Sequence, residues 1–193
     1  MVHEKMLKEL WIEFRKINYV LEHICSNTYI CVMEDSPLHI RLKQKRFESE
    51  IQQAILSILV AADIIKRRQL TVCVSKRLTH SQYNILRILK GNPEGYSRKE
   101  IIERMLEKAP DATRLIDGLV AQGMAERITS KVDKRVSLTR ITEKGKKTLI
   151  ELHEPMQTFS KELDALYNKT ELTKLADLCG RIIAHEMKDK ESH

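Results

Sequence analysis

Two helix-start signals in close succession constrain the fold of this chain more than any other feature. Thr79-His80-Ser81-Gln82 and Ser97-Arg98-Lys99-Glu100 both match a capping box. In this motif a Ser or Thr hydroxyl accepts a hydrogen bond from the third helical N–H, and a Gln or Glu side chain reaches back to the cap. The first helix must end at Gly91-Asn92-Pro93, and the second must end before Pro110. The two signals therefore predict two short helices in tandem.

A third helix and a β-hairpin complete this segment. Pro110 suits the first turn of a helix, and Gly123 suits its left-handed end. After Gly123 the pattern changes from helical to extended over residues 124–129 and 136–142, with a polar tip at residues 130–135. A winged helix-turn-helix has this order: capped helices joined by a short turn, followed by a hairpin with a basic tip.

The flanking segments predict longer helices. Apolar residues recur every three or four positions over residues 6–25, and again from Phe47 to Ile65, where Lys66, Arg67 and Arg68 would close the helix. Residues 28–33 favour an extended stretch. Thr142 would cap a long helix bent at Pro155, and a last helix would cover about residues 171–188. We expect a mainly α fold with long N- and C-terminal helices and a two-stranded β wing.

The charge distribution is compatible with a polyanionic partner. The chain has 34 Lys and Arg against 27 Asp and Glu, a net charge of +7. Basic residues are in excess over residues 1–147, whereas acidic residues outnumber them over residues 148–193. A surface that faces nucleic acid should therefore exclude the C-terminal segment.

Residues 79–150 resemble the MarR family of bacterial transcription regulators. The resemblance rests on residues 78–86 and 111–119, on Asp133-Lys134-Arg135, and on Ile141-Thr142-Glu143-Lys144-Gly145. It implies a homodimer that binds double-stranded DNA with a recognition helix in the major groove and the wing Arg135 in the minor groove. It further implies an N-terminal extension over 1–44, a dimerisation helix and connection over 45–78, a DNA-binding domain over 79–147 and C-terminal dimerisation helices over 148–193.

The candidate DNA contacts lie on polar positions of these elements. In the third helix Leu115, Ile116 and Leu119 point inward, which leaves Asp111, Thr113 and Arg114 outward, with Thr113 and Arg114 expected to contact bases or phosphates. In the wing, Arg135 is expected in a narrow minor groove, oriented by an ion pair with Asp133, while Lys131 and Lys134 neutralise phosphates. Arg98 and Lys99 are expected to contact the DNA backbone. Ala109 departs from the pattern, because a Ser or Asn there would cap the third helix better.

Catalysis, metal binding and export are not predicted. Cys25, Cys31, Cys73 and Cys179 lack zinc-ligand spacing, and the chain has no phosphate loop, nucleophile elbow or zinc-protease motif. Neither a signal peptide nor a membrane span is visible, so we expect a cytoplasmic regulator without enzymatic activity, cofactor or membrane partner.

Two functional questions stay open at the level of sequence. The resemblance suggests an effector pocket lined by Ile65, Tyr83, Arg87 and Leu149. A redox-sensing regulator that uses Cys73 or Cys25 is an alternative, although the apolar neighbours of Cys73 favour an inert thiol. The rival from another class is a winged-helix module that binds protein, whose association would be insensitive to salt.

Overall fold

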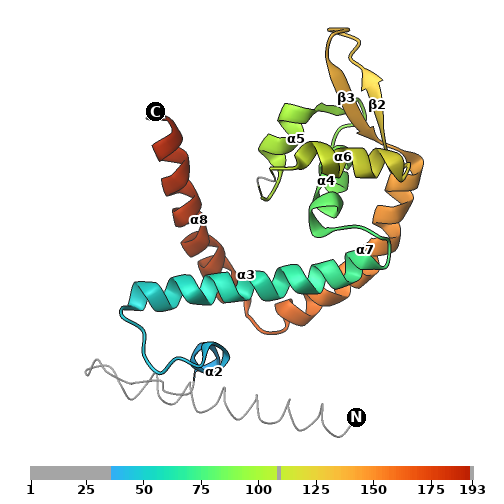
Figure 1. Cartoon of the computed structure of the whole chain (residues 1–193). Helices are drawn as coiled ribbons and strands as arrows, with labels where there is room; N and C mark the ends of the chain where they lie inside the picture. Colours follow the sequence, from blue (N-terminus) through green and yellow to red (C-terminus); the bar gives the residue numbers. More distant parts are fainter. Residues whose placement is uncertain (1–35, 108–109, 192–193) are drawn as a thin grey trace, which may run out of the picture. The chain divides into compact units, whose positions relative to one another are not determined.

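The computed structural model describes residues 36–107 and 110–191 (Figure 1). The chain divides into a unit up to Ile58 and a unit from Leu59 onward. The helix predicted over residues 6–25 and the extended stretch over 28–33 lie outside the described residues. In the first unit, α2 (Pro37–Leu42) follows Ser36, whose Oγ accepts a hydrogen bond from the backbone N–H of His39 at 3.4 Å. Pro37 occupies the first turn, where no N–H is needed.

The long helix α3 (Glu50–Val74) continues past the basic residues that were expected to end it. Cys73, in its last turn, is completely buried in the core of the second unit, and this packing favours a helix through a stretch rich in β-branched residues. A turn follows Val74, and its last residue, Arg77, adopts a left-handed conformation with φ 55°. The N–H groups of Lys76 and Leu78 both donate to the Cys73 carbonyl, at 2.9 and 3.2 Å.

Both predicted capping boxes are confirmed. Thr79 precedes α4 (His80–Lys90), and its Oγ1 accepts from the Gln82 N–H at 3.1 Å while the Thr79 N–H donates to Gln82 Oε1 at 3.0 Å. Ser97 precedes α5 (Arg98–Arg104) and exchanges the equivalent pair of hydrogen bonds with Glu100, at 3.3 and 2.8 Å. These bonds satisfy N–H groups that a helix start would otherwise leave unpaired.

The third helix of this region starts later than the sequence suggested. Helix α6 runs over Ala112–Ala121, so Pro110 lies in the preceding turn and not in the first helical turn. Asp111 occupies the N-cap position, but its side chain makes no capping hydrogen bond. At the other end, Gly123 adopts φ 70°, which confirms the left-handed cap.

The sheet has three strands where the sequence predicted two. Strands β2 (Ala125–Thr129) and β3 (Ser137–Ile141) form the expected antiparallel hairpin, with Arg127 opposite Thr139. The additional strand β1 (Tyr96–Ser97) pairs with the other edge of β3, giving the order β1-β3-β2. With only two residues, β1 is too short to show the alternation that identifies a strand in sequence.

The core of the second unit draws on five helices. Its largest completely buried side chains come from α3, α4, α5, α6 and α7 (Glu143–Asp164), and they are Ile85, Leu86, Leu89, Ile101, Leu119, Leu152 and Cys73. Two ion pairs hold α7: Arg68 of α3 contacts Glu162, and Lys76, in the turn after α3, contacts Glu151 at 2.5 Å. The fold is therefore a winged helix-turn-helix attached to long helices.

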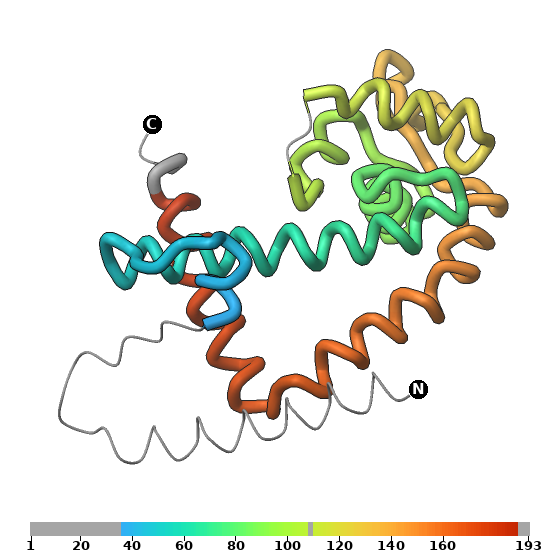
Figure 2. Tube along the Cα trace, turned by 60° about the horizontal axis from the view of Figure 1, so that its bottom comes forward, coloured from blue at the N-terminus to red at the C-terminus, as the bar shows by residue number. Residues whose placement is uncertain are grey.

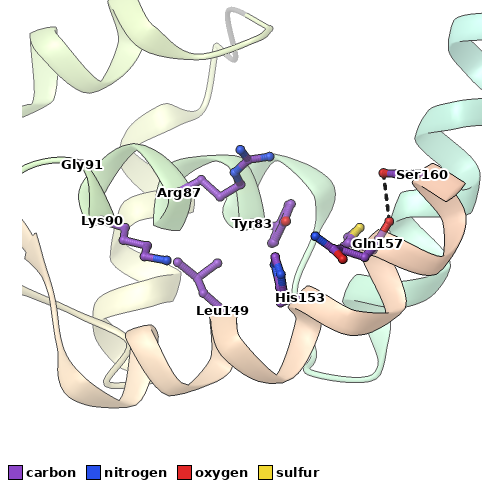
Figure 3. Close-up of a pocket in the computed structure, with 9 residues that line it drawn as sticks. Tyr83, Arg87, Lys90, Gly91, Leu149, His153, Gln157 and Ser160 are labelled. Carbon is purple, nitrogen blue, oxygen red and sulfur yellow. Dashed lines mark hydrogen bonds between the residues drawn. The ribbon is translucent and has the colours of Figure 1, made fainter. Parts of the chain in front are cut away.

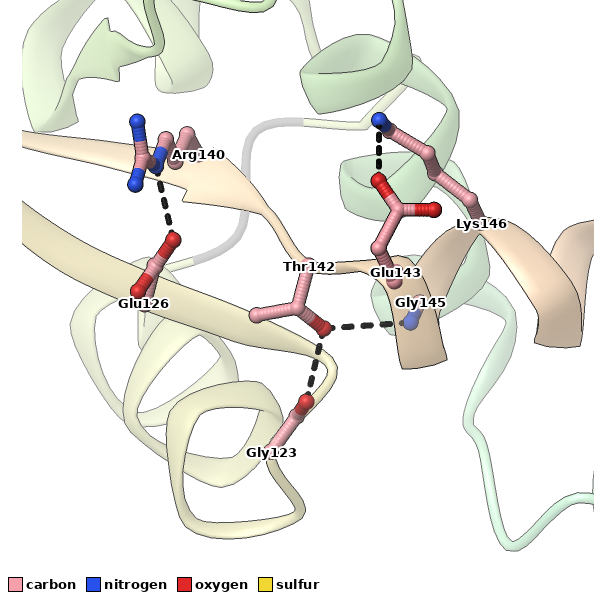
Figure 4. Close-up of polar contacts among 7 residues, drawn as sticks. All are labelled: Gly123, Glu126, Arg140, Thr142, Glu143, Gly145 and Lys146. Atoms are coloured by element: carbon pink, nitrogen blue, oxygen red, sulfur yellow. Dashed lines mark hydrogen bonds and ion pairs between the residues drawn. The ribbon is translucent and has the colours of Figure 1, made fainter.

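The junction between the wing and α7 is fixed by Thr142 (Figure 4). Its Oγ1 donates to the Gly123 carbonyl at 2.7 Å and accepts from the Gly145 N–H at 3.2 Å, which confirms Thr142 as the cap of α7. Helix α7 continues through Pro155 and leads away from the hairpin to residues 165–168, where the chain turns into α8 (Lys169–Glu191) (Figure 2). None of the described helices is long and apolar enough to span a membrane.

Candidate nucleic-acid interface

The first turn of α6 presents polar side chains to solvent. Ala112, Ile116 and Leu119 are buried on one side of the helix, and Thr113 and Arg114 are exposed on the other. The Arg114 side chain is 87% exposed, and its guanidinium lies 3.8 Å from the Asp111 carboxylate. Such a weak surface pair leaves the arginine available to another partner.

The start of α5 lies against this turn. Arg98 Nη1 donates a hydrogen bond to Thr113 Oγ1 at 3.1 Å and so links α5 to α6. Its neighbour Lys99 is exposed, with the Glu103 carboxylate 4.0 Å away at the next turn. One of the predicted backbone contacts, Arg98, therefore lies against Thr113, which is predicted to contact DNA from α6.

The wing tip is ordered by short-range hydrogen bonds. The Ser130 N–H donates to the Val136 carbonyl at 2.9 Å, and Ser130 Oγ accepts from the N–H groups of Val132 and Asp133 at 3.2 and 3.3 Å. The Asp133 carboxylate accepts from the backbone N–H of Arg135 at 2.9 Å, where the sequence suggested an ion pair with its side chain. Asp133 thus shapes the backbone of the tip, and Arg135 is exposed.

The charged side chains of the tip are accessible. Lys131 lies 3.4 Å from Glu94, and both side chains are largely exposed. For Lys134 and Arg135, both exposed, no acidic partner is recorded among the described residues. Exposed basic side chains on an ordered loop suit contacts with phosphates or with a narrow minor groove.

An ion pair connects the wing to α6. Asp117 Oδ1 accepts from Arg127 Nη2 at 2.5 Å, which joins α6 to β2 of the hairpin. The hairpin extends beyond α6 (Figure 1). A cleft of about 270 Å³ separates the first half of α6 from the strands, lined by Arg98, Thr113, Ile116, Arg127, Ser137 and Thr139. The sequence analysis did not single out Arg127; its position opposite Thr139, facing α6, follows from the strand register.

A second pocket of about 550 Å³ lies between α4 and α7 (Figure 3). Three of the four residues suggested as effector contacts line it: Tyr83, Arg87 and Leu149. Ile65 does not. The Arg87 guanidinium lies 6.0 Å from the centre of the Tyr83 ring. Lining residues that the sequence analysis did not name are Lys90, Gly91, His153, Met156, Gln157 and Ser160.

The thiol of Cys73 is chemically shielded. It is 0% exposed, and burial raises its pKa to about 11 from an ordinary value of 9.0. Because the thiolate is the reactive form, a thiol that stays protonated at neutral pH is a poor redox sensor. Cys25, the other residue considered for this role, lies outside the described residues. Over residues 36–107 and 110–191 no three His, Cys, Asp or Glu side chains gather as a metal site.

Comparisons with known proteins agree with this geometry. A sequence model described as MarR family matches residues 78–136. An uncharacterized HTH-type transcriptional regulator of Bacillus subtilis, YpoP, is 31% identical over 118 residues, which are 60% of this chain and 82% of YpoP. The chain belongs to the MarR family. This MarR-family protein is accordingly a transcription regulator and not an enzyme.

Solved structures share the fold of this MarR-family chain. A MarR transcription factor from Planctomyces limnophilus is 32% identical, with a TM-score of 0.53, and the match covers 70% of this chain and 98% of that one. A mutant of MarR from E. coli, solved in complex with operator DNA, is 22% identical, with a TM-score of 0.62 and coverage of 69% and 95%. The MarR framework therefore extends beyond the winged helix-turn-helix.

Proposed function

We propose that this MarR-family regulator binds a pseudo-palindromic operator as a homodimer, with α6 of each subunit in the major groove and Arg135 of each wing in the minor groove. The observation that carries the proposal is the joint exposure of the first turn of α6 and of the wing tip, on elements connected by the Asp117–Arg127 ion pair. The E. coli MarR mutant, which shares the fold, was solved in complex with operator DNA, and this supports operator binding by the present chain.

In this proposal the contacts divide into two kinds. Thr113 and Arg114 reach base edges from α6, since a short polar N-terminal half fits the major groove. Arg98, Lys99, Lys131 and Lys134 lie toward phosphates, which contribute affinity and register but little sequence information. Asp111 and Asp133 serve as local acceptors next to Arg114 and Arg135.

The partner that we propose for the long helices is a second copy of this chain. None of the described side chains of α8 is buried, and even its large apolar side chains are 45 to 61% exposed at Leu175, Leu178, Ile182 and Ile183. A helix of this length owes most of its stability to packing of an apolar face, so α8 needs a cover. Helix α3 adds exposed Ile55 and Leu59. An isologous dimer covers both faces at once, and it places two copies of α6 for a two-fold symmetric operator.

We further propose that a small molecule in the pocket between α4 and α7 controls operator binding. The pocket is large enough for a small ligand, and Tyr83, Arg87 and Leu149 offer an aromatic ring, a cation and an apolar side chain. Because α4 also packs against α6 in the core, a ligand that favours one arrangement of α4 would bias the position of α6.

The experiment that tests the DNA-binding proposal is operator titration with Arg135→Ala. Operators would first be selected from fragmented genomic DNA with the wild-type protein, and affinity would then be measured by fluorescence anisotropy. We expect the variant to lose about 1 to 3 kcal/mol of binding free energy. The matched control is Arg140→Ala, which removes the same charge from the same hairpin, where Arg140 pairs with Glu126 at 2.7 Å. Equal affinity of Arg135→Ala and the wild type would refute the wing assignment.

A further inference from the structure

We infer that the cleft between α6 and the wing strands binds a phosphate group of the DNA backbone, with Arg98 and Arg127 as its two cationic ligands. This inference rests on the proposed DNA binding and adds a defined site to it. The cleft has a volume of about 270 Å³, several times the roughly 30 Å³ that one water molecule occupies in the liquid.

The lining of the cleft suits an oxyanion. Besides the two guanidinium groups it carries the hydroxyls of Thr113, Ser137 and Thr139, and no carboxylate is among its lining residues. Guanidinium groups donate two parallel hydrogen bonds to phosphate oxygens, and hydroxyl groups can add further donors. Thr139 is buried, so its hydroxyl lies at the inner end of the cleft, whereas Ser137 is exposed.

Both arginines are oriented by contacts that leave most of their donors unused. Arg98 donates through Nη1 to Thr113 Oγ1 at 3.1 Å, and Arg127 donates through Nη2 to Asp117 Oδ1 at 2.5 Å. A guanidinium has five N–H donors in a planar fork, so one such contact still allows a bidentate contact with phosphate. The side chains of Arg127 and Asp117 are 51% and 55% exposed, which keeps the guanidinium accessible from solvent.

The strand register places Arg127 beside the cleft and a similar ion pair, Glu126–Arg140, on the opposite face of the hairpin. Successive residues of a strand point to opposite faces, so Arg127 and its partner position Thr139 share the face toward α6. Glu126 and Arg140 lie on the other face, where they form an ion pair at 2.7 Å with side chains about as exposed (Figure 4). Arg140→Gln is therefore a matched control for Arg127→Gln.

The test measures how the affinity for double-stranded DNA of mixed sequence depends on salt, since phosphate contacts do not require an operator. Each neutralised phosphate contributes about 0.9 to the slope of log affinity against log salt concentration. We expect Arg127→Gln to lower the slope relative to the wild type by up to about 0.9, because Arg98 remains at the site, and Arg140→Gln to leave it unchanged. Arg127→Lys should retain the slope but bind more weakly, because a lysine cannot form the bidentate contact.

The DNA affinity of Asp117→Asn shows whether Arg127 acts as a phosphate ligand or only as a partner in a structural ion pair. If Arg127 binds phosphate, removal of its competing carboxylate should raise the affinity for DNA. Weaker binding by Asp117→Asn, equal in size to that of Arg127→Gln, would overturn the inference, because the pair would then act only by positioning α6. Equal slopes for Arg127→Gln and Arg140→Gln would overturn it as well. Absence of DNA binding by the wild-type protein would instead refute the proposed function. Thermal unfolding of each variant verifies that it is folded.

Discussion

Gly145, in the first turn of α7, should not tolerate even a methyl group. A Cβ at this position would lie 2.2 Å from the Met124 carbonyl oxygen and 2.8 Å from the Ile141 side chain. The Met124 carbonyl cannot move aside easily, because it accepts the N–H of Thr142 at 3.1 Å. In Gly145→Ala, α7 must therefore move away from the wing, and the contacts of Thr142 at this junction must break or lengthen (Figure 4).

The size of the effect follows from the packing of this junction. Inserting a methyl group into a well-packed site costs about 1 to 3 kcal/mol, and a clash with backbone belongs at the upper end. For a chain of this length, each kcal/mol lowers the melting temperature by about 2 to 4 °C. We expect Gly145→Ala to melt at least roughly 4 °C below the wild type, measured by circular dichroism at equal protein concentration.

Gly180→Ala provides the control, because it is the same substitution in another helix. Nothing lies within 4 Å of a Cβ built at Gly180 in α8. Alanine in an open helix position stabilises by about 0.5 to 1 kcal/mol relative to glycine. A Gly145→Ala protein that melts at or above the wild-type temperature, as expected for an open helix position, would refute the close approach of α7 to the wing.

Three further predictions concern thiol chemistry, acid stability and assembly. Cys73, with its pKa raised to about 11, should resist a thiol reagent at pH 8 while half-buried Cys179 reacts, which peptide mapping after labelling checks. The free energy of unfolding, measured by urea titration, should fall as the pH rises above 9.0, because only the thiol of the unfolded chain ionises there. The Ser97 hydrogen bonds lower the pKa of Glu100, so the stability that its carboxylate contributes is present above the ordinary value of 4.5 and lost as the pH falls below it. In urea titrations, the free energy of unfolding of Glu100→Gln should therefore depend less on pH in this acidic range. An unchanged dependence would contradict the capping role of Glu100. Ile182→Glu places a charge on the exposed apolar face of α8 and should yield monomers in sedimentation experiments, whereas a dimer as stable as the wild type would exclude α8 from the interface.

The elements with local signals could be predicted from the sequence. Thr79 and Ser97 define helix starts through their own hydrogen bonds with Gln82 and Glu100, and Gly123 defines a helix end through its backbone conformation. Such signals depend on neighbouring residues alone, so a single sequence contains them. The wing was found for the same reason, since an extended pattern and a polar tip are local features.

Features that depend on distant contacts were predicted wrongly or not found. Helix α3 continues past Arg68 because Cys73 packs into a core built by other helices, and two-residue β1 exists only because β3 offers it an edge. The late start of α6 at Ala112 likewise has no sequence signal. Within the candidate interface, Arg127 became visible only when the register of β2 and β3 placed it beside α6.

The central claim is that α6 and the wing tip face nucleic acid together from a two-fold symmetric dimer. Hydroxyl-radical footprinting of the wild type and Arg135→Ala on a selected operator tests it most directly. We predict two protected regions related by two-fold symmetry, with centres about one helical turn apart, and flanking minor-groove protection that disappears in Arg135→Ala. A single asymmetric protected region, or flanking protection that persists in Arg135→Ala, would contradict the claim.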